Sequence, residues 1–255
     1  MKLVTWNVNS LNARMPRVLQ FLEQYEPDVA CLQETRCAPD AFPADELAAA
    51  GYSAVHHSGG QWAGVAILAR EGHELADPTS GLPGEIRADQ SRWIEATVDG
   101  VRVCSVYVVN GQAVGSEPFA EKLAFLEAMA VRAAALTGDV VIAGDMNVCP
   151  TDTDVYDPAA FVGETHVTPD ERAALAAVAE RGRLKDAYRA LHPEPEQQFT
   201  WWDYRAGNFH KGLGLRIDLA LVSESIASSL KHVGMERDYR KGTKPSDHAP
   251  LLVHW

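Results

Sequence analysis

The feature that most constrains the fold is a pair of strand-like runs separated by only two residues, Asp99 and Gly100. Residues 93–98 and 101–108 are rich in β-branched and apolar side chains, as strands are. An Asp-Gly pair supplies the positive φ angles of a two-residue turn, so the two runs are predicted to form an antiparallel hairpin. Such a hairpin favours a sheet with antiparallel pairing over a doubly wound, parallel sheet.

Strands and helices are mixed along the rest of the chain. The other predicted strands are residues 28–32, 64–69, 140–143, 199–202, 217–222 and 251–254. The predicted helices cover residues 14–26 and 117–137, and a third begins at the capping box Thr168-Pro169-Asp170-Glu171. The first helix places apolar side chains on one face, opens with a proline near its first turn and stops before Pro27. This mixture predicts an α/β sandwich with antiparallel pairing.

Composition indicates a globular protein with a sizeable core. The chain has 255 residues, of which 46% are hydrophobic, and its length suffices to bury such a core. No linker or low-complexity tract divides it, so we expect a single domain over residues 1–255. It opens without a secretory signal, and no apolar run could span a bilayer. We therefore expect a protein of the cytoplasm with no membrane partner. The sequence leaves the oligomeric state open, and nothing in it indicates more than a monomer.

The cysteines indicate a reducing environment. Cys31, Cys37, Cys104 and Cys149 form no CxxC pair and no zinc-binding spacing. Four thiols are too few to hold together a chain of this length by disulfides. We expect them to be reduced and mostly to fill the core.

The net charge of −12 argues against binding nucleic acid through bulk positive charge, because Lys and Arg contacts to phosphate supply most of the non-specific affinity. A local basic face can nevertheless coexist with acidic surfaces elsewhere. Carboxylates are also what a metal-dependent nuclease needs in its site.

Polar residues recur where predicted strands end, and such loops commonly present catalytic groups. They are Asn7-Val8-Asn9, Gln33-Glu34-Thr35, residues 107–111, Gly144-Asp145-Met146-Asn147, Arg216-Ile217-Asp218 and Ser246-Asp247-His248. Each segment taken singly is better explained as a turn, a helix cap or a structural hydrogen bond. Together they supply carboxylates for a hard cation, a base for water and donors for phosphoryl oxygens.

These segments resemble the exonuclease III group of the endonuclease/exonuclease/phosphatase superfamily, which includes the apurinic/apyrimidinic (AP) endonucleases. The resemblance runs from residue 3 to residue 253. Its markers are Trp6-Asn7-Val8-Asn9, Leu32-Gln33-Glu34-Thr35, Tyr107, Gly144-Asp145-Met146-Asn147, Pro150-Thr151-Asp152, Gly214-Leu215-Arg216-Ile217-Asp218 and Ser246-Asp247-His248-Ala249-Pro250. The resemblance implies a deoxyribonuclease I-like fold, in which two packed mixed β-sheets flanked by helices form a four-layer α/β sandwich.

The resemblance also implies a metal site and a base. Glu34 would bind Mg²⁺ with help from Asn9 and Asp247, and Mn²⁺ suits the same oxygen ligands. Asp145 would orient or deprotonate the attacking water. Asn147 and Asn7 would donate side-chain hydrogen bonds around the phosphate and the base.

A second implied group binds the phosphate. His248 would contact a phosphate oxygen, and Asp218 would fix its tautomer, because a buried carboxylate beside an imidazole raises the pKa of the imidazole. Tyr107 would offer a phenolic O–H near the same oxygens, and Asn110 would donate to the DNA backbone.

DNA contacts must then come from local features. The predicted contact residues are Arg205, His210 and Lys211 in a glycine-containing loop, together with Arg216. The resemblance implies an apolar cup for a flipped-out sugar, formed by Trp201, Leu215 and Ile217. Arg36, Arg240, Lys241 and Lys244 are equally well explained as solvated cations. Because Trp201 and Trp202 alternate along a predicted strand, only one of them can face a substrate.

Two positions depart from the family pattern. Ser10 stands where the family commonly has glycine, and Leu215 stands where mammalian relatives carry tryptophan. These differences concern the first turn and the shape of the sugar pocket.

The resemblance implies Mg²⁺-dependent hydrolysis of double-stranded DNA, with incision 5′ to abasic sites, 3′→5′ exonuclease activity and removal of 3′ phosphates and other 3′ blocks. All three reactions use one site, so the sequence does not rank them. The alternatives are a phosphoesterase acting on a non-DNA phosphate ester and a non-catalytic binding module. The complete set of polar residues argues against the binding module.

Overall fold

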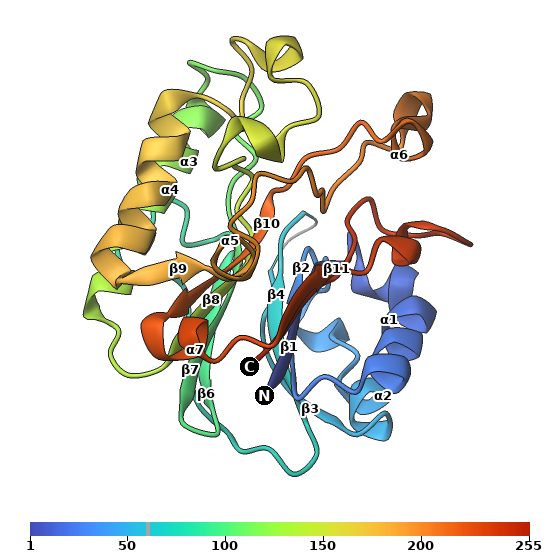
Figure 1. Ribbon diagram of the computed structural model, residues 1–255. Coiled ribbons are helices and arrows are strands. Elements are labelled where there is room, and N and C mark those ends of the chain that lie inside the picture. Colours follow the sequence, from blue (N-terminus) through green and yellow to red (C-terminus); the bar gives the residue numbers. More distant parts are fainter. Residues whose placement is uncertain (60–61) are drawn as a thin grey trace.

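Two six-stranded sheets pack face to face in the computed structural model, which describes residues 1–59 and 62–255, and helices cover their outer faces (Figure 1). The first sheet has the order β11-β12-β1-β2-β4-β3, with strands β1 (Lys2–Asn7), β2 (Val29–Gln33), β3 (Tyr52–His57), β4 (Val65–Arg70), β11 (His232–Met235) and β12 (Leu251–His254). In this sheet β1 and β2 run parallel and the other neighbours run antiparallel.

The second sheet repeats this mixed pattern. Its order is β5-β6-β7-β8-β10-β9, with strands β5 (Leu75–Ser80), β6 (Trp93–Val98), β7 (Val101–Tyr107), β8 (Val140–Asp145), β9 (Leu184–Asp186) and β10 (Asp218–Ser223). The β6–β7 pair is antiparallel around Asp99-Gly100, which confirms the predicted hairpin. Only β7 and β8 run parallel among the strand pairs of this sheet within the described ranges. Two mixed sheets between helices confirm the predicted four-layer sandwich.

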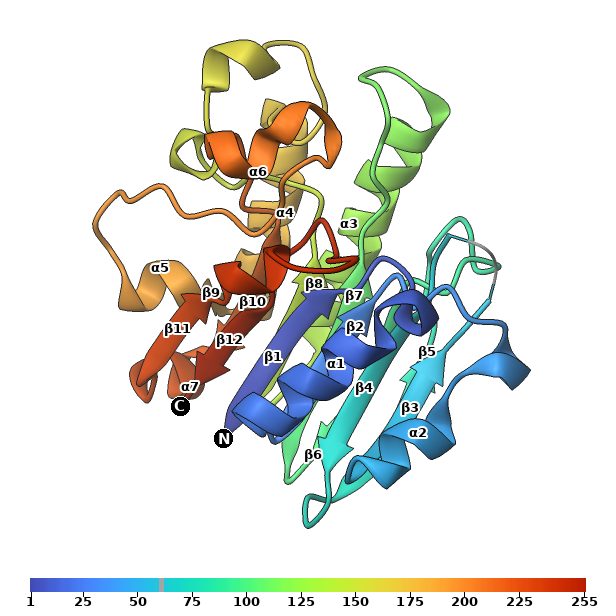
Figure 2. The ribbon, with the colours of Figure 1, turned by 90° about the vertical axis from the view of Figure 1, so that its right-hand side faces the viewer.

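The helices form the two outer layers. They are α1 (Leu11–Tyr25), α2 (Ala44–Ala49), α3 (Glu117–Ala135), α4 (Pro169–Gly182), α5 (Ala187–Leu191), α6 (Asn208–Lys211) and α7 (Glu224–Ser228), with short 3₁₀ turns at Pro39–Ala41, Asp152–Asp154, Pro158–Phe161, Arg205–Gly207 and Arg237–Arg240. Helices α1 and α2 lie on the first sheet, and α3 and α4 lie on the second (Figures 1 and 2). The two chain ends lie side by side, where the N-terminal amine donates to the carbonyl of Trp255.

Strand side chains alternate between two cores. In β2, Val29 and Cys31 enter the core between the sheets, whereas Ala30 and Leu32 enter the core under α1. Successive strand residues point to opposite faces, and both faces are covered here. Burial of both faces explains why the sequences of the inner strands are continuous apolar runs without polar alternation.

Two sequence predictions of elements are wrong. Helix α1 begins at Leu11 instead of residue 14, because the Ser10 hydroxyl caps it by accepting from the Ala13 N–H. Residues 199–202 form no ladder strand: Trp201 makes isolated bridges to Leu215 and His248. The capping box of Thr168 with Glu171 is confirmed at the start of α4.

All four cysteines are buried and free of disulfides, as the sequence predicts. Among the described residues, none of the helices combines the length and the apolar character needed to cross a membrane.

Candidate active site

The strand register gathers the polar segments at one edge of the molecule, the upper end of both sheets in Figures 1 and 2. Asn7 is the last residue of β1, and Tyr107 and Asp145 end the parallel strands β7 and β8 side by side. Asp218 begins β10 directly opposite Asp145, because β10 runs antiparallel to β8. Carboxyl ends of parallel strands and amino ends of antiparallel neighbours therefore meet at this edge.

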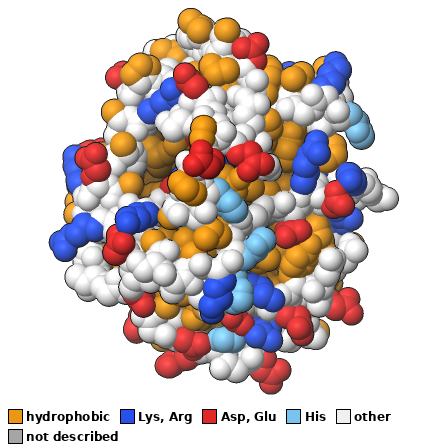
Figure 3. All heavy atoms as spheres, viewed as in Figure 1, with side chains coloured by type: hydrophobic (Ala, Val, Ile, Leu, Met, Phe, Trp, Pro, Cys, Tyr) orange, Lys and Arg blue, Asp and Glu red, His pale blue; other side chains and the backbone are white. Residues whose placement is uncertain are grey.

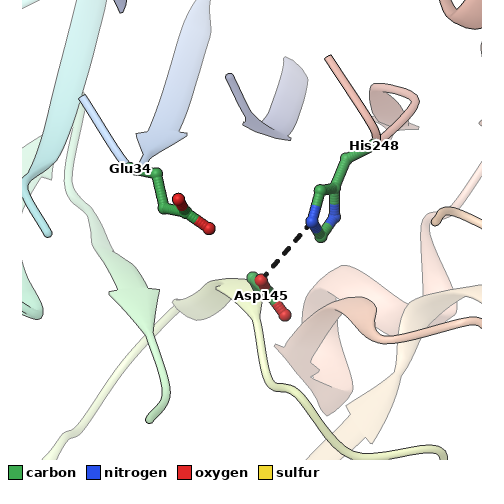
Figure 4. A group of neighbouring side chains, drawn as sticks. All are labelled: Glu34, Asp145 and His248. Carbon is green, nitrogen blue, oxygen red and sulfur yellow. Dashed lines mark ion pairs between the residues drawn. The ribbon is translucent and has the colours of Figure 1, made fainter. Parts of the chain in front are cut away.

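Three titratable side chains form the centre of the site. One carboxylate oxygen of Glu34, one of Asp145 and one ring nitrogen of His248 lie within 4.8 Å of one another. Their side chains point toward one another from three segments: Glu34 directly follows β2, Asp145 ends β8, and His248 precedes β12 (Figure 4). Asn7 connects them, since its Nδ2 donates to Glu34 Oε1 at 2.8 Å and to Asp145 Oδ2 at 2.9 Å.

This donor set suits a hard divalent cation. Two carboxylates this close repel each other unless a cation lies between them, and Mg²⁺ prefers one or two carboxylates with remaining positions filled by water. Glu34 Oε2 also accepts from the guanidinium of Arg36, with Nε at 3.0 Å. Arg36 in turn lies over the exposed ring of Trp62, 5.4 Å from its centroid.

The other two predicted metal ligands, Asn9 and Asp247, pair with each other. Asn9 Nδ2 donates to Asp247 Oδ1 at 2.9 Å, and the Trp201 indole donates to Asp247 Oδ2 at 3.1 Å. Asp247 faces the same cavity as Glu34. It lies outside the tight group formed by Glu34, Asp145 and His248.

His248 is held as a cation. Its Nδ1 lies 2.8 Å from Asp218 Oδ2, and its Nε2 lies 3.7 Å from Asp145 Oδ2. Burial alone would lower the pKa of His248, but the carboxylates of Asp218 and Asp145 outweigh burial and raise this pKa to about 10. The predicted contact between Asp218 and His248 is thus present.

Asp145 has the properties of a general base. Burial, with the charges of Asp218 and Glu34, raises the pKa of Asp145 to about 7, although cationic His248 opposes the shift. A base is most effective when its pKa lies near the working pH.

Amide and phenol groups complete the rim. The Asn147 backbone N–H donates to Asp145 Oδ1 at 2.9 Å, and its side-chain Nδ2 donates to the Val108 carbonyl. Asn110 Nδ2 donates to Asn147 Oδ1 at 3.2 Å. Burial and the charge of nearby Glu34 raise the pKa of Tyr107 well above its usual value, so its phenol remains a hydrogen-bond donor at neutral pH.

Left-handed backbone shapes the loops that carry these groups. Ser10 has a φ of 87°, Glu34 of 48° and Asn147 of 50°. Non-glycine residues rarely adopt such angles, and strained residues of this kind gather at functional sites. The angle at Ser10 also explains why glycine is common there in the family.

These groups surround a cavity of about 160 Å³. It is lined by Glu34, Tyr107, Asn110, Asp145, Asn147, His166, Trp201, Ile217, Asp247 and His248. Nine of these ten residues were singled out from the sequence, and the structure brings them together. Trp201 faces the cavity whereas Trp202 is buried, so one tryptophan of the pair faces the site, as expected.

His166 lines the cavity but belongs to none of the sequence segments predicted to form the site. Its Nδ1 lies 2.5 Å from the Asn147 carbonyl oxygen. Burial and the nearby charge of Lys122 lower its pKa to about 4, so the ring is neutral and Nδ1 carries the proton that the carbonyl accepts. His166 lies in a loop outside every recognised motif, and only tertiary contacts reveal it.

Arg216 does not face DNA, contrary to prediction. Its side chain is completely buried, with Nε 2.6 Å from Asp154 Oδ1 and Nη1 2.8 Å from Asp186 Oδ2. Two carboxylates from distant parts of the sequence hold it inside the fold. Leu215 is also buried, packed on Cys149 and absent from the cavity wall, so it cannot line a sugar pocket directly.

Three other predicted DNA-contacting residues, Arg205, His210 and Lys211, are exposed. Arg205 pairs with Asp203, and His210 and Lys211 lie on α6. On the face viewed in Figure 3, acidic and basic side chains are interspersed and Lys and Arg form no continuous patch. DNA contacts on this face would therefore have to be local, as the net charge indicates.

Comparison with known proteins places this geometry in a family. Residues 4–248 match the Endonuclease/Exonuclease/phosphatase family, and the chain belongs to that family. It is 33% identical to exodeoxyribonuclease III of Haemophilus influenzae, over 100% of both chains.

Solved structures agree with the family assignment. The chain is similar to the 3′-5′ exonuclease NExo of Neisseria meningitidis, with a TM-score of 0.94 and 40% identity over 100% of this chain and 99% of that one. It is also similar to an AP endonuclease from Archaeoglobus fulgidus, with a TM-score of 0.94 and 32% identity over 100% of this chain and 99% of that one. The predicted family and fold are therefore confirmed. The prediction that the protein is an enzyme that hydrolyses phosphate ester bonds is confirmed with them.

Proposed function

We propose that this protein is a DNA repair nuclease that hydrolyses phosphate esters of double-stranded DNA with Mg²⁺, for which Mn²⁺ can substitute. The observation that carries the proposal is the bridging of Glu34 and Asp145 by Asn7, with His248 beside them. This arrangement combines a hard-cation site, a base and a fixed cation in one cavity. Phosphoryl transfer to water requires these three elements.

Each side chain has a specific task in the reaction. Glu34 would hold the metal ion, which would neutralise charge on the scissile phosphate. Asp145, with its pKa of about 7, orients and deprotonates water. His248 donates from Nε2 to a phosphate oxygen, and Asn147 and Tyr107 donate to the charge that develops there.

The proposed substrates are duplexes with abasic sites or blocked 3′ ends, cut to leave a 3′-hydroxyl and, where a diester is cleaved, a 5′-phosphate. Support comes from relatives described as an AP endonuclease and as a 3′ phosphatase bound to a product DNA hairpin. The apolar wall of Trp201 and Ile217 suits a sugar without its base, and flipping such a residue costs less than flipping an intact nucleotide.

DNA would be held mainly through its backbone. Asn110 lies on the cavity rim, and Arg205, His210 and Lys211 are exposed beside α6. Contacts of this kind position a duplex without reading its sequence. The four free cysteines support a reducing, cytoplasmic location, and we propose that the protein acts there as a monomer.

The test is cleavage of three labelled duplexes, one with an abasic-site analogue, one with a 3′-phosphate and one intact. Each is incubated with Mg²⁺ and with EDTA. Mg²⁺-dependent incision 5′ to the lesion or release of 3′-phosphate supports the proposal, and the relative rates rank the activities. Cleavage of none of the duplexes, together with hydrolysis of a small phosphate ester, would establish a non-DNA phosphoesterase instead.

A further inference from the structure

The ammonium group of Lys122, on α3, is completely buried and contacts the backbone of two cavity residues. Its Nζ lies 2.6 Å from the Asn147 carbonyl oxygen and 3.2 Å from the Asn110 carbonyl oxygen. It also donates to Thr165 Oγ1 at 3.2 Å and pairs with Glu171 Oε1. Lysines are almost never fully buried without such partners.

These contacts connect loops that lie beyond the sheet. The ladder between β7 and β8 ends at the pair Tyr107 and Asp145. Asn110 and Asn147 follow those strand ends, so the ladder does not fix their separation. Lys122 joins their backbones, because one ammonium group binds both carbonyl oxygens, and this link adds to the side-chain hydrogen bond from Asn110 Nδ2 to Asn147 Oδ1.

Glu171 attaches a third loop to the same ammonium. Its Oε1 accepts from Thr165 Oγ1 at 2.8 Å and from the His166 N–H at 2.9 Å, and its Oε2 accepts from Thr168 Oγ1 at 2.7 Å. The His166 ring donates a hydrogen bond to the same Asn147 carbonyl oxygen that Lys122 binds. Both ends of the His166 contact therefore depend on the Lys122–Glu171 pair.

Gly111 leaves room for this arrangement. It has a φ of 88°, and a Cβ added there would lie 3.0 Å from Lys122 Cδ and 3.0 Å from Thr165 Oγ1. The aliphatic part of the Lys122 side chain therefore packs directly against the backbone of Gly111, and this packing restricts the conformation of the lysine side chain.

We propose that Lys122 is a positioning residue for catalysis, which sets Asn147 and Asn110 relative to Asp145 through their backbone carbonyls without touching the substrate. The inference rests on the proposed function. A displacement of about 1 Å in an active site can cost about 100-fold in rate. DNA affinity should change little, because it arises mostly from phosphate contacts elsewhere.

The main test is the double variant Lys122→Met/Glu171→Gln. It removes both charges and so leaves no uncompensated buried ion, and glutamine can still complete the capping box. The matched control is Arg132→Met/Glu95→Gln, which removes an ion pair between the same helix and β6, with Arg132 Nη2 2.6 Å from Glu95 Oε1.

Thermal stability, kcat and KM are measured for both variants on a 3′-phosphate duplex with Mg²⁺. We expect kcat of the Lys122 variant to fall about 100-fold, with KM within about threefold, at a temperature where it is folded. The control should keep kcat within about threefold. Wild-type kcat in the folded Lys122 variant, or an equal loss in the control, would overturn the inference.

A second measurement does not depend on activity. The ¹⁵N shifts of the His166 ring at pH 7.5 should show Nδ1 protonated in the wild type and a mixture of tautomers in the Lys122 variant, because the Asn147 carbonyl has moved. Unchanged shifts would refute positioning. If the wild type cleaves no DNA, the proposed function fails, and this readout still decides the role of Lys122.

Discussion

His248 Nδ1 lies 2.8 Å from Asp218 Oδ2, and both side chains are almost completely buried. The two residues are 30 positions apart in sequence and meet because β10 and the segment before β12 reach the same edge of the molecule. Asp218 thereby determines which nitrogen of His248 faces Asp145. A cationic imidazole with Nε2 free of Asp218 is available to a phosphate oxygen.

Replacement Asp218→Asn should lower kcat by about 100-fold or more at pH 7.5, because the imidazole loses the charge that keeps it protonated. The pKa of His248 should fall in this variant, so the alkaline limb of the pH–rate profile should move to lower pH. Steady-state kinetics between pH 5 and pH 9 provide the measurement. Asp238→Asn, at an exposed pair with Lys241, is the control; equal losses in the two variants would contradict the assigned role.

The pH dependence of kcat/KM should be bell-shaped. Asp145 must be ionised and His248 protonated, and their pKa values are about 7 and about 10. Activity should therefore rise through the first value and fall through the second, with the two apparent values belonging to the coupled pair. A profile that stays flat from pH 6 to pH 8 would show that Asp145 does not titrate as the base.

Asp145→Asn should abolish nearly all turnover while leaving DNA binding intact. It should also stabilise the protein at high pH. The folded pKa of Asp145 is raised, so its contribution to stability is complete below the unfolded value of about 3.9 and is lost as pH rises through about 7. Asparagine stays neutral, so the melting temperature should exceed that of wild type at pH 8 by about 2 °C or more and match it near pH 4. An unchanged difference across this range would argue against the raised pKa.

Glu34→Gln should weaken Mn²⁺ binding by about tenfold or more, since one of the two clustered carboxylates is lost. Isothermal titration calorimetry of the free protein measures this without reference to turnover. Glu127→Gln, at an exposed pair with Arg181, should bind Mn²⁺ like wild type. Equal affinity in the Glu34 variant would move the metal site away from this cluster.

Patterning predicted much of the fold because strands buried on both faces and helix caps are local signals. The strands at Trp93–Val98 and Leu251–His254 have the predicted bounds. Residues 199–202 were mistaken for a strand because their aromatic composition resembles one, whereas Trp201 bonds to irregular segments at Leu215 and His248. That pairing depends on how the loops meet and leaves no local trace.

The site likewise contains residues that the sequence predicts and residues that only tertiary contacts reveal. Motif residues such as Glu34 and Asp145 could be identified because they occur at strand ends in a recognisable order. Lys122 and His166 could not, since a helix lysine and a loop histidine acquire their roles only through contacts with Asn147. Arg216 was wrongly predicted to contact DNA because it lies next to site residues in sequence. Its ion-pair partners, Asp154 and Asp186, are distant in sequence and could not be predicted.

The burial of Arg216 and the exposure of Lys211 predict different effects when each of these two cations is replaced. Arg216→Met removes one of the two arginine partners of the fully buried Asp154, the other being Arg189, and also the partner of Asp186. Breaking a buried pair on one side costs about 3–5 kcal/mol. The melting temperature should therefore drop strongly. Lys211→Ala, on the exposed end of α6, should leave stability unchanged, weaken DNA binding and reduce the slope of log Kd against log salt by about 1. If Arg216→Met instead kept its stability and lost DNA affinity with a reduced salt slope, the guanidinium would have to reach DNA, and its burial between Asp154 and Asp186 would not describe the protein in solution.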